Sequence, residues 1–382
     1  MAFIGTLCLI LVATMFAAHF CRRIGIPGVI GQLLVGVLLG KAVLNWIQPN
    51  VLVHEFSEIG VIVLMFLAGL ESDLSLLKKY FRPGILVALL GILFPVVMGF
   101  VTGNVFHPTW NEAIFLGILL AATSVSISVE ALKELNVLDT KEGSTILGAS
   151  VVDDILIVLV MSLSLAFLAP NVEQRLPFPI LLLEQVVYFA LIYLLVRFIA
   201  PYLMKLSQRL FTSGAVIIMS LVICLAMSYI ADFVGLSSVI GAFFAGIAVS
   251  QTEVKQEVQL NTEALGYAVF IPVFFVSIGL EVNFDHFMDQ LVYILIFTLV
   301  AVLSKLLGGF IGARAAGFSQ NSSLMVGAGM ISRGEMALII LQLGYEAKLI
   351  DQTFYSPIVI VILLTTLVSP LILKYFTKKV YA

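Results

Sequence analysis

Long apolar stretches recur along the whole chain of 382 residues and are separated by short polar turns. A helix needs roughly 20 mostly apolar residues to cross the hydrocarbon core of a bilayer. Hydrophobic residues make up 61% of the chain and charged residues only 11%, which leaves too little polar surface to cover a water-soluble domain of this size. The sequence therefore predicts an all-α polytopic membrane protein that resides in a lipid bilayer.

Apolar runs bounded by charged residues, proline or glycine predict thirteen transmembrane helices. The first run precedes its arginines instead of following them, so we expect a membrane helix there and not a cleavable signal peptide. The predicted helices cover residues 3–20, 26–43, 54–71, 84–103, 112–134, 142–169, 179–207, 213–231, 234–250, 264–280, 291–313, 322–346 and 355–375.

The distribution of lysine and arginine between the loops predicts the orientation. The loops that follow odd-numbered helices, together with the C-terminal tail, hold most of the basic residues, whereas the opposite side holds only Lys41, Arg175 and Lys348. Basic loops tend to stay on the cytoplasmic side of a membrane. The N-terminus is therefore predicted to lie outside and the C-terminus in the cytoplasm.

Composition and motif content exclude several classes of function. The three cysteines form no C-x-x-C pair, the four histidines are scattered, and the net charge is only -3. The sequence has no phosphate-binding loop, no nucleotide-binding fingerprint and no Ser/His or metal dyad at membrane depth. We therefore expect no cofactor, no structural metal, no nucleic-acid partner and no enzymatic activity.

An internal repeat appears when the chain is compared with itself at an offset of 210 residues. The stretch GIPGVIGQLLVG at 25–36 matches GLSSVIGAFFAG at 235–246, and GLE at 69–71 matches GLE at 279–281. The offset moves each predicted helix seven helices along, and an odd step reverses its orientation in the membrane. The sequence thus predicts two inverted six-helix repeats joined by a linker helix, which is typical of secondary transporters.

Three charged residues in the apolar helices have no counterpart in the repeat. Asp153 and Asp154 correspond to leucines in the second half, and Lys305 corresponds to a proline in the first. At about 1.5 Å of rise per residue, all three reach similar depths near the membrane midplane. One charge there costs about 2.5–3.5 kcal/mol, so we expect one aspartate to pair with Lys305 and the other to face a cavity. A purely stabilising ion pair is the alternative interpretation.

Polar residues interrupt two helices at corresponding places of the two repeats. The fifth predicted helix contains Thr123 and Ser124 at its centre, and the twelfth contains Arg333 and Glu335. Paired interruptions predict discontinuous helices, whose freed carbonyls and helix ends are available to ions. The alternative for the hydroxyl side chains is hydrogen bonding to their own helix. The alternative for Arg333 and Glu335 is a local pair that compensates the broken helix ends.

Six motifs extend over nearly the whole chain in the order VIGQLLVGVLLG, FLAGLE, ATSVSIS, GASVVDD, SKLLGGFIGA and ISRGEMALI. On these motifs the sequence resembles the monovalent cation:proton antiporter-2 superfamily, specifically the NapA-type bacterial sodium/proton antiporters. The resemblance implies a multi-pass protein of a bacterial inner or plasma membrane that forms a homodimer.

The resemblance also implies a core transport domain and a dimerisation domain. The last three helices of each repeat form the core domain, which holds the crossed helices, and the first three form the dimerisation domain. In this sequence the dimerisation domain is expected at 1–76 and 213–285, the core domain at 77–170 and 286–382, and the linker helix at 171–212.

The family's site residues carry over by motif position. Asp154 becomes the carboxylate that binds the transported sodium ion or a proton, and Asp153 forms the ion pair with Lys305. Thr123 and Ser124 lie at the helix crossing. In the family an aspartate pair goes with electrogenic exchange of two protons for one sodium. The implied function is secondary active exchange of sodium or lithium for protons, by competition at Asp154.

Other functions remain open at the level of the sequence. Potassium/proton or mixed-cation exchange uses the same scaffold, because cavity size and ligand count decide the ion. An organic-anion/sodium symporter is a more distant alternative, since no substrate signature for one is recognisable. A non-transporting membrane sensor on the same fold is the alternative from another class, although titratable groups at the midplane argue against it.

Overall fold

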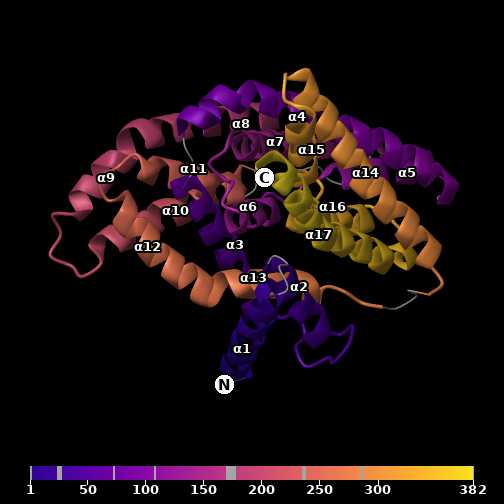
Figure 1. The fold of residues 1–382 in the computed structure, drawn as a ribbon, viewed down its shortest axis with the longest axis horizontal. Helices are drawn as coiled ribbons and strands as arrows, with labels where there is room; N and C mark the ends of the chain where they lie inside the picture. Colours follow the sequence, from indigo (N-terminus) through magenta and orange to yellow (C-terminus); the bar gives the residue numbers. More distant parts are fainter. Residues whose placement is uncertain are drawn as a thin grey trace. The chain divides into compact units, whose positions relative to one another are not determined.

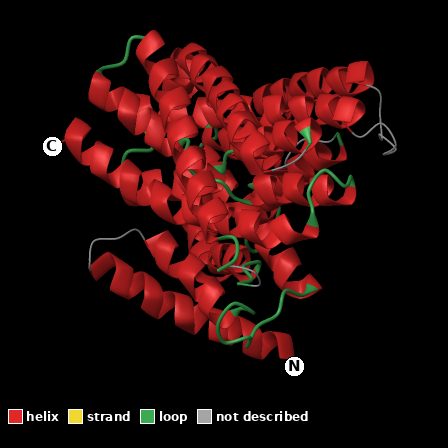
Figure 2. Cartoon of the chain, turned by 90° about the vertical axis from the view of Figure 1, so that its right-hand side faces the viewer, coloured by secondary structure: helices red, strands yellow, loops and turns green. Residues whose placement is uncertain are grey.

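The fold is known from a computed structural model, which describes residues 2–23, 28–71, 74–106, 109–168, 178–234, 238–284 and 288–381. Within these ranges every regular element is a helix, as Figures 1 and 2 show. The match of Gly25 with Gly235 and the basic residue Arg175 lie outside the described residues. The prediction of an all-helical chain is confirmed for the part that the structure describes.

The helices follow one another along the chain with short connections (Figure 1). Two short π-helical segments, labelled η, continue α8 and α12. The elements are α1 (Ala2–Arg23), α2 (Gly28–Leu39), α3 (Val51–Glu71), α4 (Leu74–Phe106), α5 (Trp110–Ala121), α6 (Val125–Glu134), α7 (Lys141–Leu168), α8 (Phe178–Leu194), η1 (Leu195–Ile199), α9 (Ala200–Ser207), α10 (Ala215–Phe233), α11 (Ser238–Ser250), α12 (Lys255–Leu265), η2 (Gly266–Phe270), α13 (Ile271–Leu280), α14 (Leu291–Ala315), α15 (Gln320–Gly329), α16 (Glu335–Glu346) and α17 (Gln352–Tyr381).

The lengths and composition of these helices fit a membrane protein that crosses the bilayer many times. Ten helical stretches in the described part are long and apolar enough to cross a membrane. Shorter apolar helices cover Gly28–Leu39, Ser238–Ser250 and Met336–Tyr345. The expected multi-pass helical architecture is therefore present.

Several helices are longer than the sequence predicts. α4 begins at Leu74 and not at residue 84, because Pro83 lies inside the helix instead of at its start. α12 begins at Lys255, ahead of the predicted start at 264, because its first turns are polar but still helical. A charged residue or a proline can end an apolar run without ending the helix, so the predicted starts of these helices are too late. A membrane helix tolerates proline where neighbouring groups satisfy the freed carbonyls.

The two predicted interruptions are real breaks in the helices. The predicted helix 112–134 consists of α5 and α6, which are separated by the non-helical residues 122–124. The predicted helix 322–346 consists of α15 and α16, with a break at 330–334. Each break frees main-chain donors and acceptors that need partners inside the protein.

The chain divides into two compact units. The first unit contains Met1–Val12, Asn50–Leu74 and Leu176–Phe275, and the second contains Ala13–Pro49, Ser75–Arg175 and Val276–Ala382. All the residues singled out by the sequence for chemistry belong to the second unit, where α14, α15 and α17 pack together (Figure 1).

A pair of close helix contacts inside the second unit involves glycine. Gly36 on α2 lies directly against the main chain of Val276 and Gly279 on α13, with no room for a Cβ atom. Small residues of this kind let the backbones of membrane helices approach closely.

The first unit contains a matching contact. Gly246 on α11 lies against the main chain of Phe66 and Gly69 on α3. Gly246 lies 210 residues after Gly36, and Val276 and Gly279 lie 210 residues after Phe66 and Gly69. The same contact is therefore made twice, with the roles of the two halves of the sequence exchanged.

Candidate functional site

The two helix breaks lie against each other and share hydrogen bonds. The Ser124 main-chain N–H donates to the Ser332 carbonyl over 2.8 Å, and the Ser332 hydroxyl donates to the Ser124 carbonyl over 3.0 Å. Groups freed by one break thus satisfy groups freed by the other. This mutual bonding explains how non-helical backbone is tolerated in a buried position.

Ser128 on α6 strengthens the same junction. Its hydroxyl donates to the Gly329 carbonyl over 2.5 Å and lies 2.8 Å from the hydroxyl of Ser332. It also lies 3.2 Å from the carbonyl of Ser124, four residues earlier in its own chain segment. Bonding to the preceding turn, which the sequence offers as an alternative, therefore occurs together with contacts across the two breaks.

Arg333 uses its guanidinium to satisfy main-chain carbonyls near the breaks. Its Nε and Nη2 atoms donate to the carbonyl of Leu120, in the last turn of α5, over 3.0 and 2.6 Å. Nη2 also reaches the carbonyl of Ala301 on α14 over 2.9 Å, and Nη1 reaches that of Ile331 over 3.0 Å. A fully buried cation at the carboxyl end of α5 interacts favourably with the helix dipole there.

The other polar residues of the interrupted helices take different positions. Ser124 is the N-cap of α6, and its hydroxyl lies 3.3 Å from that of Ser126. Thr123 is buried, and its hydroxyl faces the Asp153 carboxylate. Glu335 is the first residue of α16, and its side chain lies outside what the structure describes.

The structure brings Lys305 and Asp153 together. The Lys305 ammonium lies 3.2 Å from Oδ1 and 3.3 Å from Oδ2 of Asp153, and neither side chain is exposed. Gly91 on α4 lies close to the lysine, since a Cβ atom there would lie 3.8 Å from Nζ. A buried charge with a partner of opposite sign costs far less than an isolated one.

Asp154 follows Asp153 on α7 and is also buried, with 4% of its surface exposed. It is near enough to Lys305 to interact with it electrostatically. Two adjacent carboxylates therefore share the surroundings of a single lysine, next to the junction of the two breaks. Carboxylate, hydroxyl and carbonyl oxygens are hard ligands that suit small hard cations, and a carboxylate can also carry a proton.

Some features of this region were not predicted from the sequence. The carbonyls that bind Arg333 leave no trace in the sequence, because every residue has a carbonyl. Thr366 on α17 donates a hydrogen bond to the Arg333 carbonyl, and it lies in an uncharged stretch of its helix that does not stand out in the sequence. Glu130 on α6 is also buried, although the sequence does not single it out. Among the described residues no cluster of three or more His, Cys, Asp or Glu side chains could hold a metal ion.

Comparison with known proteins gives the family. Residues 9–379 match the model of the sodium/hydrogen exchanger transmembrane family. The chain is 72% identical over the full length of both proteins to a protein of Enterococcus hirae named Na(+)/H(+) antiporter. It is 44% identical to the Na(+)/H(+)-K(+) antiporter GerN of Bacillus cereus, covering 98% of this chain and 96% of GerN.

A solved structure shares the fold. The sodium proton antiporter MjNhaP1 from Methanocaldococcus jannaschii superposes with a TM-score of 0.75 over 99% of this chain and 98% of that one, at 17% sequence identity. The match of the family model over nearly the whole sequence and the high identity to the relatives lead to one conclusion. The chain belongs to the sodium/hydrogen exchanger family.

Proposed function

We propose that this protein exchanges sodium or lithium for protons across a bacterial plasma or inner membrane by competition at Asp154. One observation carries the proposal: two adjacent buried aspartates on α7 share one buried lysine, and that lysine is bonded to Asp153. Asp153 has its counter-charge in Lys305, and Asp154 provides the second carboxylate. Sodium and a proton bind Asp154 in turn, so that the binding of one displaces the other.

The Lys305 pair supplies the second proton of an electrogenic cycle. When sodium arrives, Asp153 turns its oxygens toward the ion, and Lys305 loses its two hydrogen-bond acceptors. An ammonium without those acceptors in a buried site releases a proton. The cycle then moves two protons for one sodium. Thr123 and Ser124 contribute oxygens from the junction, whereas Arg333 and Glu335 hold the broken helix ends.

The architecture that we propose is that of the NapA-type antiporters, with thirteen membrane helices in two inverted repeats and a linker helix. The matching contacts of Gly36 and Gly246 support the repeat, since each has its counterpart 210 residues away. The helix breaks also correspond, because an offset of 210 moves residues 122–124 onto 332–334.

The domain assignments and the surroundings of the protein follow the same proposal. The dimerisation domain comprises 1–76 and 213–285, the core domain 77–170 and 286–382, and the linker 171–212. The protein forms a homodimer with the N-terminus outside and the C-terminus in the cytoplasm. Movement of the core domain against the dimerisation domain gives the site access to each side in turn.

Potassium exchange is the second candidate. It is favoured by the relative GerN, which is named for potassium as well as sodium and is 44% identical to this chain. Sodium is the first choice because the relative at 72% identity is named for sodium and protons alone.

The test follows the collapse of a preformed pH gradient in everted vesicles from antiporter-deficient cells after addition of sodium, lithium or potassium. Wild-type protein is compared with Asp154→Asn and with a matched control, Asp351→Asn, which changes an exposed aspartate. Sodium or lithium should collapse the gradient with the wild type and the control but not with Asp154→Asn.

Other results would change the conclusion. A response to potassium alone would be consistent with competition at Asp154 but would show that the exchanged cation is potassium and not sodium or lithium. No response to any cation would favour the non-transporting sensor. Full activity of Asp154→Asn would show that the aspartate pair is structural, and the competition mechanism would then be wrong.

A further inference from the structure

A buried carboxylate at the start of α7 takes no part in the proposed exchange. Glu142 is the second residue of this helix, and its side chain is fully buried. Asp153 lies eleven residues further along the same helix, about 17 Å away at 1.5 Å per residue. A carboxylate so far from the aspartate pair needs a separate explanation for its burial.

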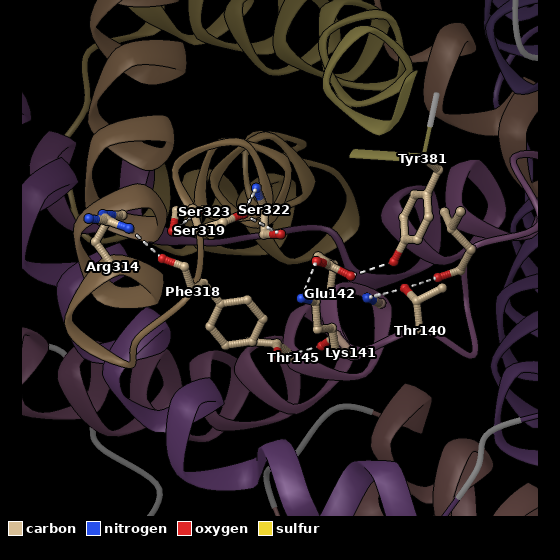
Figure 3. A network of polar contacts seen from close by, with 12 residues as sticks. Thr140, Lys141, Glu142, Thr145, Arg314, Phe318, Ser319, Ser322, Ser323 and Tyr381 are labelled. Atoms are coloured by element: carbon tan, nitrogen blue, oxygen red, sulfur yellow. Dashed lines mark hydrogen bonds and ion pairs between the residues drawn. The ribbon is translucent and has the colours of Figure 1, made fainter. Parts of the chain in front are cut away.

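The partner of Glu142 comes from the other end of the sequence. The hydroxyl of Tyr381, in the last turn of α17, donates to Oε2 of Glu142 over 2.5 Å, and Figure 3 shows the phenol ring pointing at the carboxylate. The ammonium of Lys141 lies 3.6 Å from Oε1, which accepts no hydrogen bond within the described part of the chain. The phenol is therefore the strong hydrogen-bond donor to this carboxylate.

The same cluster reaches the turn between α14 and α15. The ammonium of Lys141 lies 5.9 Å from the ring centre of Phe318, and the carbonyl of Phe318 accepts a hydrogen bond of 2.6 Å from Arg314 (Figure 3). A second bond joins α15 to the end of α17, from the Asn321 side chain to the Lys379 carbonyl over 3.3 Å. The cluster thus connects the ends of α7, α14, α15 and α17.

These helices carry the groups of the candidate site. Asp153 and Asp154 are on α7, Lys305 is on α14, and α15 leads into the second helix break. Eleven residues make about three helical turns, so Glu142 and Asp153 lie on the same face of α7. Ile146 and Ala149, on the face between them, are buried. In a helix packed in this way, a shift at its start would also displace the aspartates.

We propose that Tyr381 is a positioning residue for cation exchange. By bonding to Glu142 it fixes the start of α7, and through this helix it sets where Asp153 and Asp154 lie relative to Lys305. The inference rests on the proposed exchange at Asp154. It assigns to the end of α17 a role in cation affinity in addition to packing.

The test measures the apparent KM for sodium in everted vesicles for Tyr381→Phe, which removes only the hydroxyl. The matched control is Tyr375→Phe, on the same helix, where the ring is exposed. We expect Tyr381→Phe to raise the apparent KM about fivefold, which is a usual size for coupling through packed elements. Its maximal rate per folded protein should stay within about twofold of the wild type, and the control should keep the wild-type KM.

A double variant tests whether the phenol acts through Glu142. If it does, Glu142→Gln combined with Tyr381→Phe should raise the KM no more than the larger single change, because both remove one interaction. The KM does not depend on the amount of protein, so it is measurable even if a variant accumulates less.

The outcomes separate this inference from the proposed function. A wild-type KM for Tyr381→Phe, a loss of maximal rate alone, or additive effects in the double variant would overturn the positioning role while leaving exchange intact. Failure of the wild type to respond to any cation would instead overturn the proposed function.

Discussion

The ammonium of Lys305 lies 3.2 Å from Oδ1 of Asp153, and both side chains are completely buried. The two charges come from helices that are 152 residues apart in the sequence. Neither charge has access to bulk water, and each is the direct ion-pair partner of the other. The stability of the protein should therefore respond differently to removal of one partner and to removal of both.

Removal of one partner should be strongly destabilising. Lys305→Met leaves Asp153 as a buried charge that has lost its ion-pair partner, at a cost of about 3–5 kcal/mol. The double variant, with Asp153→Leu added, should recover most of this loss, because a well-packed apolar pair replaces the ionic one. Thermal unfolding of the purified protein in detergent measures the stability of the single and the double variant. Lys378→Met, at an exposed lysine, is the control. A wild-type melting temperature for Lys305→Met would contradict the expectation.

Alanine at the two matching glycines should destabilise the protein to similar degrees. Gly36→Ala and Gly246→Ala each place a Cβ atom against main-chain atoms, which cannot move aside as a flexible side chain can. We expect a cost of about 1–3 kcal/mol at each position. Gly5→Ala is the control, because nothing lies within 4 Å of its Cβ position, and alanine favours a helix. If Gly5→Ala lowered the melting temperature as much as the other two variants do, the tight contacts would not be the cause of the destabilisation.

Lysine should not replace Arg333. Its compact ammonium cannot reach the carbonyls of Leu120, Ala301 and Ile331 together, so buried acceptors lose their donors. Each loss costs about 1–3 kcal/mol. Arg333→Lys should therefore lower the melting temperature and reduce exchange, whereas Arg209→Lys, at an exposed arginine, should change both much less. Equal effects of the two substitutions would show that the buried contacts of Arg333 are unimportant.

The hydrogen bonds from the Gly28 N–H to Glu134 should contribute more to the stability of the protein than the surface ion pair between Glu134 and Arg22. Both carboxylate oxygens of Glu134 lie 2.9 Å from the main-chain N–H of Gly28, at the amino end of α2. Loss of such a cap costs about 1 kcal/mol. Arg22 lies 3.2 Å from the same carboxylate but is 67% exposed, and an exposed pair contributes at most about 1 kcal/mol.

Glu134→Ala should accordingly lower the melting temperature more than Arg22→Ala does. Hydrogen exchange of the Gly28 amide gives a direct measurement, since the amide should lose protection only in the Glu134 variant. The reverse order of the two variants would assign the stabilisation to the ion pair and not to the cap.

The sequence predicted the main features of the candidate site because their physical signals are strong. Asp153, Asp154 and Lys305 stand out as charges in apolar runs, where burial is costly enough to require a partner. The breaks at 122–124 and 330–334 are visible as polar residues and glycine within otherwise apolar helices. The roles of these residues in ion binding remain a prediction.

Other features could not be predicted because the sequence carries no signal for them. Charge at Lys255 marks the end of an apolar run, but α12 is helical from that residue. Glu142 and Tyr381 are 239 residues apart, and only the fold brings them together. From the sequence alone, a tyrosine near the end of an apolar helix is expected to be an ordinary side chain at the membrane interface.

The four hydrogen bonds of the Arg333 guanidinium within the described part of the chain all end on main-chain oxygen atoms. Every amino acid supplies a carbonyl, so a change of side chain at Leu120, Ala301 or Ile331 does not remove an acceptor. The arginine can stay fixed while these positions vary between relatives without correlated substitutions. Methods that infer contacts from co-varying positions will therefore miss this contact, although it ties together three segments of the protein.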